Sequence, residues 1–212
     1  MEACASPKVT VVTHPLGAAC LGRLRDQDTP KAEFSAALAH VGALLFWEAL
    51  RDTRLATTQV TTPGGATVDV GAPVDNIVLL PILRAGLGFL RGIEPWAPSA
   101  PVATVGVSRD HTTLEPRIYH ETLPPLAGRD VFVLEPMLAT GGSACAVLER
   151  LRATQPASLT LLSLIAAPVG VAAVRQTAPE ARVFVAAIDS GLDARGYIVP
   201  GLGDAGDRLL GT

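Results

Sequence analysis

Two kinds of apolar pattern alternate along the chain. Short runs that are apolar at nearly every position, and rich in β-branched residues, occupy residues 76–83, 101–108, 131–134, 158–168 and 181–188. Other segments, such as residues 144–151, carry apolar side chains at helical spacing. Strands that are apolar on both faces and alternate with helices are typical of a parallel sheet covered on both sides. The pattern therefore predicts an α/β fold, a mainly parallel twisted sheet with helices on both faces.

Local signals predict the remaining elements. A short strand is expected at residues 9–15, a helix from Pro30 to about Leu50, a hairpin over 56–73, and helices from the glycines after Arg84 to about Gly92 and over 169–176. Two polar segments are predicted as loops. Residues 109–130 show no periodicity, and so long a loop within a compact domain is usually functional or mobile. Residues 189–212, rich in Gly and Asp, are interpreted as a binding loop.

Composition narrows the class of protein. The 212 residues are enough for one compact domain, and about half of them are hydrophobic. A formal net charge of −3 argues against a general nucleic-acid binder. The longest apolar run, residues 159–174, is interrupted by Pro168 and Gly170 and is shorter than the ~20 residues of a membrane helix. Three cysteines without metal-ligand spacing, and an N-terminus without a signal-peptide pattern, favour the cytoplasm.

The segment VFVLEPMLATGGSACAVLERL, residues 131–151, predicts a strand, a loop and a helix in succession. The N–H groups at the start of a helix have no acceptor within the helix, and the helix dipole adds partial positive charge there, so an anion such as phosphate binds well. Glu135, at the end of the strand, is suited to bind sugar hydroxyls. No Lys follows the glycines, which excludes the nucleoside-triphosphate P-loop. An ordinary helix cap is the alternative interpretation of the TGGS turn.

Further charged residues follow predicted strands. Arg84 and Arg109 each come directly after an apolar run, as do the segment from Glu135 to Ser143 and the C-terminal segment 189–212. Because ligands of open parallel α/β sheets bind at the carboxyl ends of the strands, we expect these groups to converge on one site.

Three motifs together resemble those of uracil phosphoribosyltransferases, within the type I phosphoribosyltransferases. They are LPILRAGLG at 80–88, EPMLATGGS at 135–143 and GYIVPGLGDAGDRLLGT at 196–212, and the similarity extends from about Val9 to Thr212. The resemblance implies a single domain over residues 1–212, with a flexible hood at approximately 106–128 and a uracil loop at approximately 189–207. It implies transfer of the 5-phosphoribosyl group of PRPP to N1 of uracil, which gives UMP and diphosphate. It also implies Mg²⁺ held mainly through PRPP and water, GTP binding in some relatives, and a homodimer or higher homo-oligomer.

The resemblance assigns roles to residues that match the motifs. Catalytic roles fall to Arg84, Arg109 and Asp204. Uracil would be bound by Ile198, Gly203, Asp204 and Ala205. PRPP would be bound by Arg84, Arg109, Glu135, Pro136, Met137, Leu138, Ala139, Thr140, Gly141, Gly142, Ser143 and Asp204.

The chain departs from the family pattern in three places. Glu135 stands where the family usually has Asp, Ser108 replaces a common aromatic residue, and Phe46 with Trp47 replaces a more usual Thr-Tyr pair. Glu135 keeps open a second hypothesis, a sensor or regulator of the same fold that binds PRPP or UMP without turnover. An RNA-binding regulator and a phosphoribosyltransferase for another base are further alternatives, opposed by the net charge and by the uracil-loop match respectively.

Overall fold

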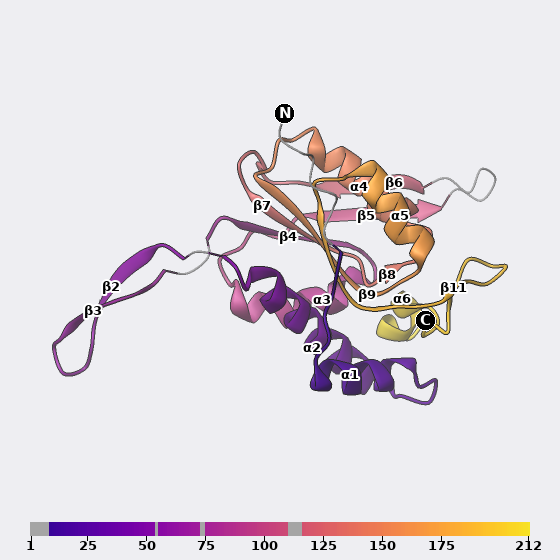
Figure 1. Ribbon diagram of the computed structural model, residues 1–212, viewed down its shortest axis with the longest axis horizontal. Helices are drawn as coiled ribbons and strands as arrows, with labels where there is room; N and C mark the ends of the chain where they lie inside the picture. Colours follow the sequence, from indigo (N-terminus) through magenta and orange to yellow (C-terminus); the bar gives the residue numbers. More distant parts are fainter. Residues whose placement is uncertain (1–8, 54, 73–74, 110–115) are drawn as a thin grey trace.

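The structure, a computed structural model, describes residues 9–53, 55–72, 75–109 and 116–212 (Figure 1). Its main strands are β1 (Val9–Val11), β4 (Ile77–Leu83), β5 (Thr104–Arg109), β6 (Pro116–Thr122), β7 (Asp130–Leu134), β8 (Met137–Leu138), β9 (Ser158–Ala166) and β10 (Arg182–Ile188). They form one sheet in the order β1-β10-β9-β7-β4-β5-β6, with β8 beside β9. Every pairing is parallel except that of β5 with β6. The mainly parallel sheet predicted from the apolar runs is confirmed.

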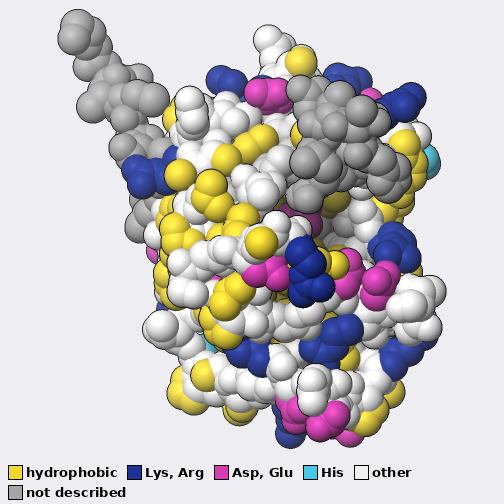
Figure 2. Space-filling model, turned by 90° about the vertical axis from the view of Figure 1, so that its right-hand side faces the viewer, with side chains coloured by type: hydrophobic (Ala, Val, Ile, Leu, Met, Phe, Trp, Pro, Cys, Tyr) yellow, Lys and Arg dark blue, Asp and Glu magenta, His cyan; other side chains and the backbone are white. Residues whose placement is uncertain are grey.

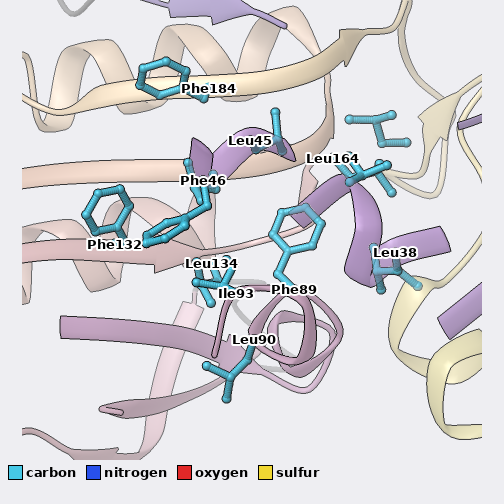
Figure 3. Close-up of a cluster of buried hydrophobic side chains, with 14 of the residues drawn as sticks. Leu38, Leu45, Phe46, Phe89, Leu90, Ile93, Phe132, Leu134, Leu164 and Phe184 are labelled. Carbon is cyan, nitrogen blue, oxygen red and sulfur yellow. The ribbon is translucent and has the colours of Figure 1, made fainter. Parts of the chain in front are cut away.

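Helices cover both faces of this sheet, as the pattern predicted (Figure 1). They are α1 (Pro15–Arg25), α2 (Lys31–Leu50), α3 (Gly86–Ile93), the short 3₁₀ helix η1 (Glu94–Trp96), α4 (Gly142–Arg152), α5 (Pro168–Thr177) and α6 (Ala205–Leu210). Successive residues of a strand point to opposite faces. Ile77 of β4 accordingly belongs to the core beneath α2 and α3, and Val78 to the core beneath α4 and α5. Figure 3 shows the first of these cores, where the rings of Phe46 and Phe132 meet edge to face at 5.0 Å.

The helix α2 is a core helix. Among the described residues it is the one helix that is long and apolar enough to cross a membrane by length and composition. Eight of its residues are nevertheless buried, among them Phe34, Leu38, Val41 and Leu45, and they belong to the same core as residues of β7 and β9. Its apolarity is therefore accounted for by packing against the sheet on one side and against α1 and α3 on others.

The polar segment 109–130 was predicted as a loop, and this is wrong for part of it. Residues 116–122 form β6, the last strand at one edge of the sheet, paired antiparallel with β5. Ile118 is its one half-buried residue, and the others are exposed. A strand that contacts the sheet along one side and buries almost nothing has no apolar alternation, so the sequence pattern did not indicate it.

Other segments also differ from the prediction. The strand expected at 9–15 ends at Val11, and α1 follows from Pro15, capped by the side chain of His14. The terminal segment 189–212 is not a loop throughout. It contains the short strands β11 (Gly191–Leu192) and β12 (Ile198–Val199), which pair antiparallel, and then α6. This last helix has its own start signal, because the Asp204 side chain accepts a hydrogen bond from the Asp207 N–H at 2.9 Å.

The hairpin predicted over 56–73 is present as β2 (Thr57–Thr61) and β3 (Thr67–Gly71). In Figure 1 it extends to the left, away from the main sheet. The side chains of Val60 and Val68 on it are both more than two-fifths exposed.

Candidate active site

A pocket of about 380 Å³ lies at the carboxyl ends of the central strands. Eight residues assigned to ligands from the sequence line it together: Arg84, Glu135, Met137, Ala139, Ile198, Gly203, Asp204 and Ala205. They come from three segments that are far apart in the chain. Figure 2 shows the corresponding face of the molecule, where basic and acidic side chains gather near the centre. The convergence expected from the strand ends is therefore observed for these residues.

The loop before α4 forms one rim of this region. Gly141 has φ +84°, a left-handed conformation that glycine adopts readily, and it precedes the first turn of the helix. No described residue accepts a hydrogen bond from the N–H groups of Thr140 or Ser143, and the Gly142 N–H makes only a 3.4 Å contact with the Thr140 hydroxyl. These N–H groups are thus available to an anion, supported by the dipole of α4.

The helix α5 supports this loop from behind. Gly170 approaches the loop so closely that a Cβ atom built on it would lie 2.5 Å from the Ala139 carbonyl oxygen and 2.7 Å from that of Leu138. Pro136 and Leu138 are buried, and the backbone N–H of Ala167 donates to the Leu138 carbonyl at 2.9 Å. Pro136 and Leu138 therefore hold the loop in place and do not present their side chains to the pocket.

Glu135 occupies an unusual environment for a carboxylate. Its side chain lines the pocket, but its Oε2 atom is buried and has no hydrogen-bond partner among the described residues. Burial raises the pKa of Glu135 from its ordinary value of 4.5 to about 8, because the charged form loses its hydration. A carboxyl group with an unused polar atom at the wall of a cavity is suited to a polar ligand there.

Arg84 and the start of α6 contact each other across the pocket. The Arg84 Nη2 atom donates to Asp207 Oδ1 at 2.6 Å, and both side chains are about half exposed. Gly206 lies under the guanidinium group, so a Cβ there would be 3.7 Å from Arg84 Nη2. Arg84 lines the pocket and Asp207 does not, so the ion pair lies at the edge of the pocket.

The segment from 195 to 206 forms the opposite wall. Ile198 and Ala205 are buried, whereas Gly203 has φ +80° and leaves its peptide groups open to the cavity. Arg195 and Tyr197 also line the pocket, with the guanidinium carbon 5.3 Å from the centre of the ring. Neither was assigned to a ligand from the sequence, although Tyr197 lies within the GYIVPGLGDAG motif and was in reach of that signal.

Arg109 ends β5, and its side chain falls outside the part of the chain that the structure describes. The same holds for residues 110–115 of the expected hood.

A parallel sheet with a helix N-terminus and a Gly/Thr/Ser loop at its carboxyl edge defines a class of α/β protein that binds phosphorylated ligands. A hypoxanthine-guanine phosphoribosyltransferase from Bacillus anthracis shares this fold, with a TM-score of 0.50 at 13% identity over 89% of this chain and 85% of that one. The uracil phosphoribosyltransferase family model matches residues 11–212, and the chain belongs to this family. Its activity is the formation of UMP from uracil and PRPP.

The sequences of individual relatives align with nearly the whole of this chain. The uracil phosphoribosyltransferase of Myxococcus xanthus is 46% identical over 207 residues, which is 97% of this chain and 98% of that protein. That of Lacticaseibacillus paracasei is 41% identical over 97% of this chain and 99% of the relative. The solved structure of the AQ2163 protein from Aquifex aeolicus has a TM-score of 0.90 at 38% identity, covering 95% of this chain and 97% of that one.

Proposed function

We propose that phosphoribosyl transfer takes place in the pocket at the carboxyl edge of the sheet. PRPP would lie between the N-terminus of α4 and Arg84, and uracil would lie against the segment 198–205. The observation that carries the proposal is that Arg84, Glu135 and Asp204, which come from three distant segments, line one cavity. Beside it lie the N–H groups of Thr140 and Ser143, for which the described ranges provide no acceptor.

Each part of PRPP has a suitable partner in this arrangement. The N–H groups and hydroxyls of the 139–143 loop would hold the 5′-phosphate, because a helix N-terminus stabilises an anion. Glu135 faces the cavity and would bind a ribose hydroxyl, as donor when protonated and as acceptor when ionised. Arg84 would bind the pyrophosphate, with Arg109 from the end of β5 as the second cation.

Uracil would be recognised by backbone groups. Its edge alternates hydrogen-bond acceptors and donors, and the backbone at Ile198, Gly203 and Ala205 offers both kinds at fixed spacing. Cytosine reverses one donor–acceptor pair and would leave a polar group of the site unpaired, which costs affinity.

The reaction develops positive charge on the ribose and negative charge on the leaving pyrophosphate. Arg84 and Arg109 would stabilise the second of these charges. The hood, residues 106–128, would exclude the water that competes with uracil for the ribose. Its described residues comprise the end of β5, all of β6 at the edge of the sheet, and the connection 123–128 that follows. The hood and the uracil loop, residues 189–207, would both be parts of a single domain that comprises residues 1–212.

The residues of the pocket suit a magnesium ion that is bound mainly by the substrate PRPP. No group of three or more His, Cys, Asp or Glu side chains in the described ranges is arranged to hold a metal. Mg²⁺ commonly keeps several waters and binds through one or two carboxylates together with substrate phosphates. Asp204 is a carboxylate in this pocket and would supply such a contact, directly or through water. When bound with PRPP, the ion neutralises charge on the pyrophosphate.

A homodimer or higher homo-oligomer is the assembly that we infer for this chain. A largely apolar cleft of about 1030 Å³ runs between α1, α2 and η1. Trp47 and Trp96 meet there edge to face at 4.6 Å and are 48% and 59% exposed. A large exposed apolar surface of this kind is characteristic of an interface. Sedimentation of wild type beside Trp47→Glu tests the inference, since a loss of mass in the variant is expected.

The cytoplasm is the compartment that we infer. Cys20 and Cys145 are free thiols in the structure, which suits a reducing environment.

The experiment is chromatographic detection of UMP after the protein is mixed with uracil, PRPP and MgCl₂. Reactions with cytosine, with hypoxanthine and without magnesium are the controls.

Asp204→Asn keeps the helix cap but removes the charge, and we expect a loss of about tenfold or more in turnover. Asp28→Asn, in an exposed turn, is the matched control and retains activity. PRPP binding by calorimetry without any product would contradict the proposal and favour a sensor.

A further inference from the structure

Asp189 is a buried charge next to the base-binding segment. It directly follows β10 and is 7% exposed. The other polar side chains that are buried in the described ranges are uncharged. Its Oδ1 and Oδ2 atoms accept hydrogen bonds from Nη2 and Nη1 of Arg25, at 2.5 and 2.8 Å. Oδ2 also accepts the Gly201 N–H at 2.9 Å. Burial alone raises the pKa of Asp189, but the hydrogen bonds from Arg25 and Gly201 outweigh it and hold the pKa below its ordinary value.

Both peptide groups of Gly201 are held by this ion pair. The N–H donates to Asp189, and the carbonyl oxygen accepts from Arg25 Nη1 at 2.8 Å, so the three residues close a ring. Gly201 has φ +64°, and a Cβ atom there would collide with the Ile198 carbonyl oxygen. This position therefore requires glycine, and the hydrogen bonds from the ion pair fix the orientation of its peptide groups.

A second arginine holds the next carbonyl of the segment. Arg208, from α6, donates to the Leu202 carbonyl at 2.9 Å and also to the carbonyls of Leu24 and Asp26 at the end of α1. Its guanidinium carbon lies 4.3 Å from the centre of the Phe34 ring. Two consecutive carbonyls between Ile198 and Gly203 are thus each bound by an arginine, and both arginines connect them to α1.

We propose that Arg25 and Asp189 are positioning residues for the uracil base. They touch no substrate in this arrangement. They fix the peptide groups of Gly201, and through them the orientation of Ile198 and Gly203 on either side. The proposal rests on the assignment of residues 198–205 to uracil. A backbone that recognises a base through its own N–H and C=O groups must be held within a few tenths of an ångström, because it has no side-chain rotamer with which to adjust.

The test measures the KM values for uracil and PRPP separately in Arg25→Lys. Lysine keeps the charge but lacks the fork that bonds both Asp189 oxygens and the Gly201 carbonyl at once. We expect the KM for uracil to rise about tenfold or more, with the KM for PRPP within about twofold of wild type. Arg152→Lys is the matched control, because Arg152 also pairs with a carboxylate, Glu180, and binds a carbonyl, that of Thr177, away from this pocket. Both of its KM values should stay at the wild-type level.

An unchanged KM for uracil in folded Arg25→Lys overturns the proposal, even if its melting temperature falls. Asp189→Asn, which keeps size and an acceptor for the Gly201 N–H, is measured in the same way if the lysine variant does not fold. Hydrogen exchange of residues 198–204 in the wild type is a measurement that needs no variant. Exchange as slow as that of β10 supports the proposal, and exchange as fast as that of an open loop overturns it.

Gly203→Ala distinguishes this proposal from the base assignment beneath it. A rise in the KM for PRPP and not for uracil would overturn the assignment, and the positioning proposal with it. A rise in the KM for uracil in Gly203→Ala, with none in Arg25→Lys, would overturn the positioning proposal alone.

Discussion

Replacing Glu135 by Gln tests whether the buried carboxyl group is uncharged near neutral pH. Glutamine has nearly the same size and is neutral at every pH, so it imitates the protonated acid. In the folded protein the pKa of Glu135 is raised from 4.5 to about 8 by burial, with one oxygen lacking a hydrogen-bond partner in the described part of the chain. In the unfolded chain the group is hydrated and has its ordinary pKa.

The sign and size of the effect follow from these two values. Between them the folded protein binds one proton more than the unfolded chain, so the free energy of unfolding falls as pH rises. The two pKa values differ by about 3.5. This difference corresponds to a fall of about 5 kcal/mol in the free energy of unfolding between pH 4.5 and pH 8. A loss of this order is a large share of the stability of a typical domain.

The assay is urea denaturation of wild type and Glu135→Gln at several pH values between about 5 and 8. The other titrating groups are common to both proteins, so the difference between the two isolates Glu135. The stability of wild type relative to the variant should fall by about 1.4 kcal/mol per pH unit. Glu149→Gln, at an exposed position of α4, controls for the loss of one carboxylate and should follow wild type. A difference between wild type and Glu135→Gln that stays constant across the range would refute the reasoning.

Three further predictions concern the pocket. Arg84→Ala should lower kcat/KM for PRPP about a hundredfold while the KM for uracil changes by less than about threefold, because its expected target is pyrophosphate. Steady-state kinetics with each substrate varied measures this, and equal losses for both would contradict the assignment. Glu135→Asp should preserve or improve the affinity for PRPP measured by calorimetry, and a large loss would mean that the site has adapted to the longer side chain. Gly170→Ala should weaken PRPP binding and cost about 1–3 kcal/mol of stability through displacement of the Ala139 carbonyl, whereas Gly22→Ala, on α1 with open space around it, should not.

The parts of the fold that the sequence predicted well are those with a local periodic signal. The apolar residues at helical spacing in α4, Ala144, Val147, Leu148 and Leu151, are all buried, and β4, β7 and β9 are nearly continuous apolar runs. The edge strand β6 has no such signal, because its side chains contact little. The loop that we propose for the 5′-phosphate could be singled out because the residues that suggest it are nine consecutive ones, 135–143.

The contacts that orient the site were not predictable in the same way. Arg84 and its partner Asp207 are 123 residues apart, and Arg25 and Asp189 are 164 apart. No spacing rule connects residues at such separations, and each looks locally like an ordinary surface charge. Only the fold brings them together.

The contact between Gly170 and the loop of residues 138–143 has a consequence for transfer of the motif between proteins. The loop takes its shape from a glycine some thirty positions further along the chain, on a different helix. Grafting EPMLATGGS and the helix after it onto another α/β scaffold would therefore not reproduce the proposed anion site unless a second helix also approached the loop through a residue without a side chain. A designer who wishes to move this site must copy two segments, the second of which carries no chemistry of its own.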